Sequence, residues 1–247
     1  RHRRQLRTEA ATAQAAALSS TQAAGLTTAQ MQSLEGADLA ALTTAVIGNL
    51  SATQFGALTN LQLGELTTTQ AGAVTASQVA QLSTTQIASI EAADFGKLNT
   101  SAIAGLSNSQ AAAITADQVA AMSTAQVAVM GAAQIGQLGI SQTQALTTAQ
   151  AAALTATQIA GLSTNQINAM DTADVAALST SAIASLGNTQ MGALTGEQLA
   201  NLTTTQFGKL SASQLGAIDD GAIGALTTTQ AQNLSAAQAA GLTASQM

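Results

Sequence analysis

The sequence predicts an all-α solenoid, a superhelical array of very short capped helices with one helix in each eight-residue repeat. The unit Leu154–Gly161 recurs along the chain as Leu-[Ser/Thr]-x-x-Gln, followed by an apolar residue and two small residues. From Leu18 onward, 29 copies follow one another without insertion or deletion, the last of them incomplete. Repeats of this kind stack so that each one contacts mainly its neighbours.

Positions 1 and 6 of the repeat predict the core. Position 1 is Leu in 22 of the 29 copies and another large apolar residue in the rest. Position 6 is usually apolar and holds all three Phe residues of the chain, Phe55, Phe95 and Phe207. Position 7 is nearly always Ala or Gly, which lets another stretch of backbone approach closely. We therefore expect an aliphatic core beneath a surface of Thr, Ser, Gln and Asn.

Positions 2 and 5 predict where each helix begins. Position 2 is Thr in 12 copies and Ser in 9, the residue types preferred at a helix N-cap. Position 5 is Gln in 22 copies and completes the Ser/Thr-x-x-Gln capping box. Positions 1 and 6 then occupy the two sites of a hydrophobic staple. The pattern therefore predicts a helical segment from about position 3 to position 8.

Two other structures compete with this interpretation. A continuous helix would turn its apolar stripe by about 80° in every copy, because eight residues do not complete a whole number of turns. A flat strand would place positions 1 and 6 on opposite faces of a sheet. A β-solenoid, which turns a corner between these positions, remains the alternative fold.

The pattern covers nearly the whole chain. Residues 1–9 are off pattern and basic, and we interpret them as a solvated end or as an arm that docks on an acidic surface. Residues 10–17 form a degenerate copy suited to a capping repeat. Residues 10–247 thus form a single continuous array of about thirty repeats. We expect the chain to be a slice of a longer protein, because it begins without Met and ends within a copy.

Composition excludes several classes of function. The net charge is −6, and four of the six Lys and Arg residues lie within residues 1–7, so we expect no nucleic-acid partner. Ser, Thr and Gln interrupt every apolar run before it reaches the ~18 residues of a membrane span. The chain has no Cys, its one His is His2, and no phosphate-binding loop is present. We therefore expect no enzyme activity and no cofactor.

A few copies carry acidic residues in place of the cap and the Gln. The structural interpretation is that these carboxylates satisfy free N–H groups and complement the helix dipole. The alternative is a Ca²⁺ site, since paired carboxylates are ligands suited to this ion. In three cases the next copy has also lost its Gln. The acidic pairs are Glu35 with Asp38, Glu91 with Asp94, Asp171 with Asp174, and Asp219 with Asp220.

The units at Leu26–Gln30, Leu146–Gln150 and Leu226–Gln230 carry a resemblance to a known group of proteins. They resemble the Leu-[Ser/Thr]-Thr-x-Gln repeat arrays of very large bacterial secreted or cell-surface proteins, often labelled adhesins. The resemblance implies an exported structural segment, found outside the cell or on its surface, that forms a shaft, a surface layer or a self-assembling filament. The partners expected are further copies or other surface components. The alternative is a binding module that presents a regular Thr and Gln surface to ice, polysaccharide or another protein.

Overall fold

The computed structural model describes residues 11–247, so the basic end and Ala10 lie outside the described residues. From Ala11 to Met247 the chain is a series of short helices without a single strand. The predicted all-α fold is therefore confirmed, and the β-solenoid alternative is wrong. From Ser20 onward, each helix begins at position 3 of its copy and ends between positions 6 and 8, as the capping box predicts.

The chain divides into two compact units, Arg1–Met122 and Ser123–Met247. Within the described part of the first unit, residues 11–16 are helical. The helices that follow are α2 (Ser20–Ala24), α3 (Thr28–Ser33), α4 (Gly36–Ala41), α5 (Thr44–Asn49), α6 (Ala52–Gly56), α7 (Asn60–Gly64), α8 (Thr68–Ala71), α9 (Ala76–Val79), α10 (Thr84–Ser89), α11 (Ala92–Phe95), α12 (Thr100–Ala104), α13 (Asn108–Ala113) and α14 (Ala116–Ala121).

The second unit continues the same pattern. Its helices are α15 (Thr124–Val129), α16 (Ala132–Gly136), α17 (Ile140–Gln144), α18 (Thr148–Ala153), α19 (Ala156–Ala160), α20 (Thr164–Ala169), α21 (Thr172–Ala177), α22 (Thr180–Ala184), α23 (Asn188–Met191), α24 (Gly196–Asn201), α25 (Thr204–Phe207), α26 (Ala212–Gly216), α27 (Asp220–Ile223), α28 (Thr228–Gln232) and α29 (Ala236–Ala239).

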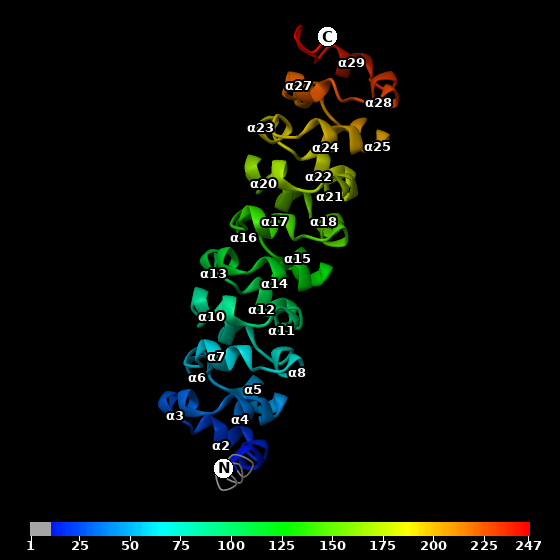
Figure 1. Cartoon of the computed structure of the whole chain (residues 1–247). Coiled ribbons are helices and arrows are strands. Elements are labelled where there is room, and N and C mark those ends of the chain that lie inside the picture. Colours follow the sequence, from blue (N-terminus) through cyan, green and yellow to red (C-terminus); the bar gives the residue numbers. More distant parts are fainter. Residues whose placement is uncertain (1–10) are drawn as a thin grey trace, which may run out of the picture. The chain divides into compact units, whose positions relative to one another are not determined.

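Within each unit a helix packs against the third helix before it and the third helix after it (Figure 1). In the first unit α5 packs on α2 and α14 on α11, and in the second unit α18 packs on α15 and α29 on α26. One turn of each unit therefore contains three helices, or 24 residues. We refer to the three copies of one such circuit as a turn of the stack.

The core has the composition expected from positions 1 and 6. Leu at position 1 and the apolar residue at position 6 are buried through most of both units, and Phe55, Phe95 and Phe207 are at most 1% exposed. Position 5 is buried as well, although it carries the polar Gln. None of the described helices has the length and apolar character needed to cross a membrane.

Small residues at position 7 allow successive turns to meet backbone to backbone. A Cβ atom added to Gly96 would lie 2.4 Å from the carbonyl oxygen of Ala121, one turn further along. The same addition at Gly136 would lie 2.7 Å from the carbonyl oxygen of Gly161. These distances are shorter than real Cβ contacts, so the glycines set how closely the turns approach.

Candidate functional site

The capping box closes the start of each helix. In α19 the N-cap Thr155 has an extended backbone, with φ −80° and ψ 159°. Its Oγ1 accepts a hydrogen bond from the backbone N–H of Gln158 at 3.3 Å, and Gln158 Oε1 accepts one from the backbone N–H of Thr155 at 2.8 Å. The extended backbone at the cap separates successive helices, as the sequence predicts.

The other end of the same Gln side chain binds the preceding turn of the stack. Gln158 Nε2 donates to the carbonyl oxygen of Val127 at 2.8 Å and to that of Met130 at 2.7 Å. These carbonyls belong to the end of α15 and the residue that follows it, and the Val127 carbonyl also accepts the backbone N–H of Met130 at 3.2 Å. One Gln therefore satisfies the start of one helix and the end of another.

This bond between turns recurs throughout both units and is the main feature that the sequence interpretation missed. In each case Nε2 donates to carbonyl oxygens 28 and 30 or 31 residues earlier in the chain. A Glu would complete the capping box equally well, but its carboxylate has no N–H to donate. The presence of Gln, and never Glu, at position 5 was the available signal. Further Gln residues with this bond are Gln54, Gln62, Gln70, Gln78, Gln86, Gln110, Gln118, Gln166, Gln190, Gln198, Gln206, Gln214, Gln230, Gln238 and Gln246.

Three copies replace this Gln by Asp, and we call them the acidic copies; they contain α4, α11 and α21. Their position-5 residues Asp38, Asp94 and Asp174 are 9%, 3% and 3% exposed. Asp38 Oδ1 accepts a hydrogen bond from Thr12 Oγ1 at 2.9 Å, across 26 residues of sequence. Asp174 is hydrogen bonded to the side chain of Thr148, which stands at the same spacing in the preceding turn. A hydroxyl of the preceding turn thus meets the carboxylate in these two copies.

The position-2 acids of the same copies do not cap their helices. Glu35, Glu91 and Asp171 make no side-chain cap hydrogen bond, and all three are exposed. The expectation that these acids satisfy free N–H groups is therefore wrong for these three residues. It holds for Asp219, whose Oδ1 accepts a hydrogen bond from the backbone N–H of Gly221 at 2.9 Å.

Burial changes the acidity of two of the position-5 carboxyls. Loss of solvation raises the pKa of Asp94 above its usual value of 3.8, and the charge of Glu91 raises it further. Burial is also the largest cause of the raised pKa of Asp174, where the Thr148 hydrogen bond opposes the shift and Asp171 adds to it. Both copies therefore hold a buried carboxyl that retains its proton more strongly than a free one.

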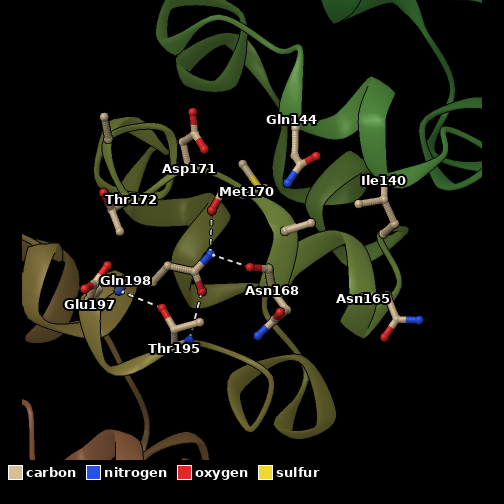
Figure 2. A pocket seen from close by; sticks show the side chains of 12 residues that line it. Ile140, Gln144, Asn165, Asn168, Met170, Asp171, Thr172, Thr195, Glu197 and Gln198 are labelled. Carbon is tan, nitrogen blue, oxygen red and sulfur yellow. Dashed lines mark hydrogen bonds between the residues drawn. The ribbon is translucent and has the colours of Figure 1, made fainter. Parts of the chain in front are cut away.

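An open pocket of about 760 Å³ lies in the second unit beside the acidic copy of α21 (Figure 2). The carboxylates of Asp171 and Glu197 and the amides of Gln144 and Asn165 line it, together with the exposed side chain of Ile140. This lining offers hydrogen-bond acceptors and donors beside apolar side chains such as Ile140. Its remaining lining residues are Asn168, Ala169, Met170, Thr172, Ala173, Thr195 and Gln198.

The structure does not identify a set of ligands for Ca²⁺ among the described residues. Within residues 11–247, no three or more His, Cys, Asp or Glu side chains gather into a group that could hold a metal ion. In the acidic copies the position-5 carboxyl is buried and the position-2 carboxyl is exposed. Glu35, Asp38, Glu91, Asp94, Asp171, Asp174, Asp219 and Asp220 are therefore not assigned as metal ligands.

Each acidic copy lies near the start of a stretch that is similar to a known repeat family. Three stretches of the chain, residues 31–68, 87–124 and 167–204, match the family described as ALTTAQ repeat. Each matching stretch begins four residues before the first acid of an acidic copy, at Glu35, Glu91 or Asp171. The acidic copy and the Gln-free copy after it thus recur at one place in the ALTTAQ-repeat stretches. No curated protein matches the chain.

Proposed function

We propose that the chain is a structural segment of an exported bacterial protein, which works as a shaft, a surface layer or a self-assembling filament. The Gln bond between turns carries this proposal. Because Gln158 links the start of its helix to carbonyl oxygens of the preceding turn, its polar groups are used inside the stack. A chain built in this way holds its copies at a fixed separation, and the proposal includes no catalytic step.

Deletion of whole turns tests the role in spanning distance. Removal of residues 146–169 takes out three copies and leaves the register of the remaining copies intact. Such a chain should fold with the same helical content and show a shorter maximum dimension in small-angle X-ray scattering. Removal of 12 residues from the same place, which breaks the register, is the matched control and should reduce helical content. An unchanged maximum dimension after the 24-residue deletion would oppose the shaft role.

Self-association is the second part of the proposal. Charged residues make up only 7% of the chain, so electrostatic repulsion between separate chains is weak. We expect sedimentation to detect larger assemblies as protein concentration rises, and electron microscopy to show layers or filaments. Monomers alone at high concentration would remove self-assembly and leave the shaft role standing.

A binding module is the second candidate, and the pocket beside Asp171 favours it. Amides and carboxylates on one open surface suit the hydroxyl groups of a polysaccharide. Binding of bacterial or host polysaccharides to the wild-type chain, and its loss in Asp171→Ala with Glu197→Ala, would support this role. Asp117→Ala removes an exposed carboxylate elsewhere and should bind normally. An ice-recrystallisation assay tests whether ice, rather than a polysaccharide, is the regular surface recognised.

A further inference from the structure

The buried carboxyls of Asp94 and Asp174 occupy the place of a group that donates hydrogen bonds in most copies. There, Gln Nε2 supplies N–H donors to the preceding turn, as Gln158 does to Val127 and Met130. An ionised Asp has no donor, whereas a protonated Asp has one O–H. Protonation therefore restores at these two positions the kind of group that the rest of the array uses.

The surroundings of Asp174 contain no positive charge. Its helix α21 packs on α18, whose residues are all uncharged, and on α24, which carries Glu197. Asp171 lies in the same copy, and the hydroxyl of Thr148 is its hydrogen-bond partner. Ionisation of Asp174 thus adds a buried negative charge to a region that is already acidic.

The helices that pack on the helix of Asp94 also carry no positive charge. Its helix α11 packs on α8, which has no charged residue, and on α14, which carries the exposed Asp117. Glu91 lies in the same copy and its charge disfavours ionisation of Asp94. Lys97 follows α11 and is the one cation in this copy.

We propose that the acidic copies of α11 and α21 are pH-sensitive joints that are more stable in acid, because ionisation of Asp94 or Asp174 places a negative charge in a buried site beside a second acid, Glu91 or Asp171. Each carboxyl has a higher pKa in the folded chain than 3.8, its ordinary value. Such a group stabilises the fold fully below the ordinary value, and this contribution is lost as the pH rises through the folded-state pKa. The joints are therefore firm in acid and weaker at neutral pH, whatever role the whole array has.

Substitution by Asn tests the proposal, because Asn is neutral at every pH and retains an N–H donor. In Asp94→Asn with Asp174→Asn, the melting temperature should exceed that of the wild type at pH 7 and approach it near pH 4. The matched control is Asp117→Asn, which changes an exposed carboxylate on α14 and should keep the wild-type pH dependence. An unchanged pH dependence in the double variant would overturn the proposal.

A second measurement applies to the wild-type chain and needs no variant that might fold poorly. Carbon-13 NMR of the side-chain carboxyls should give titration midpoints for Asp94 and Asp174 above the ordinary value of 3.8. Hydrogen exchange, corrected for its intrinsic pH dependence, should slow at the starts of α11 and α21 as the pH falls from 7 to about 4, near the ordinary carboxyl value. Midpoints at or below 3.8, or equal protection at both pH values, would contradict the proposal.

Discussion

Asn99 Nδ2 donates a hydrogen bond to the carbonyl oxygen of Val74 at 2.5 Å, and this bond replaces one that a missing Gln would make. Position 5 of this copy is Ala102, and Val74 lies 28 residues before it, the spacing at which Gln amides donate elsewhere. Asn99 Oδ1 also caps its helix by accepting from the backbone N–H of Ala102 at 2.9 Å. Asn99 thus caps its own helix and also makes a hydrogen bond to the preceding turn, which Gln makes in other copies.

Exchange of Asn99 for Ser should keep the cap and remove the donor. We expect Asn99→Ser to lower the free energy of unfolding by about 1 kcal/mol, since a carbonyl between turns loses its partner. Adding Ala102→Gln should recover this loss, whereas Ala102→Gln alone should gain little because Asn99 already occupies the carbonyl. Urea unfolding of the two single variants and the double variant measures the coupling. Equal effects of Ala102→Gln with and without Asn99 would show that the two side chains do not share this carbonyl.

Substitution of Gln by Glu distinguishes the role of the amide oxygen in the capping box from the role of the amide nitrogen in the bond between turns. Gln158→Glu keeps an acceptor for the N–H of Thr155 but places a carboxylate near the carbonyls of Val127 and Met130. We expect a loss of about 3 kcal/mol at pH 7, because a buried charge replaces a donor. The loss should shrink as the pH falls and the carboxyl is protonated. Gln22→Glu, at an exposed Gln with the same capping box, is the control and should change stability by less than about 0.5 kcal/mol.

Removal of cap side chains should affect hydroxyl and acidic copies differently. Thr155→Ala deletes a cap hydrogen bond and should cost about 1 kcal/mol in thermal or urea unfolding. Glu91→Ala deletes no cap bond and relieves repulsion of the Asp94 carboxylate, so it should be neutral or slightly stabilising. A comparable loss in both variants would mean that Glu91 supports its helix in a way the structure does not show.

Two glycines at position 7 form a matched pair for testing the close approach of turns. Gly96 and Gly224 have φ values of −63° and −64°, so Ala suits either backbone. An added Cβ would lie 2.4 Å from the Ala121 carbonyl oxygen at Gly96, but its nearest neighbour at Gly224 is 3.7 Å away. We expect Gly96→Ala to cost about 1–3 kcal/mol, and Gly224→Ala to be neutral or to gain up to about 1 kcal/mol. Equal melting temperatures would show that the turns can separate freely.

The sequence was sufficient to predict the helix of each copy because the signals are local. Thr155 and Gln158 lie in one box, and their residue types alone define where α19 begins. The number of copies in a turn was not predictable, because it depends on the angle between successive helices rather than on any one residue. The second role of Gln158 concerns atoms 28 and 31 residues away, so a pattern of period eight did not reveal it.

The acidic copies show the same limit. Glu91 is not among the residue types preferred at an N-cap, although an acid there was expected to satisfy free N–H groups, and its side chain makes no cap bond. The burial of Asp94 depends on the packing of α11 against α8 and α14, which only the stack determines. The sequence located these residues correctly as departures from the repeat, and the packing determined what each of them contacts.

The hydrogen bonds between turns join residues that lie at most 31 positions apart in the sequence. Gln158 finds its carbonyl partners 28 and 31 residues earlier, and no longer separation is needed to complete a turn. Contact order is therefore low, a property associated with fast folding. Five consecutive copies, such as those of residues 122–161, contain all the partners of one helix start. Folding can therefore propagate from copy to copy, so a chain that emerges slowly from a ribosome can gain structure as it appears.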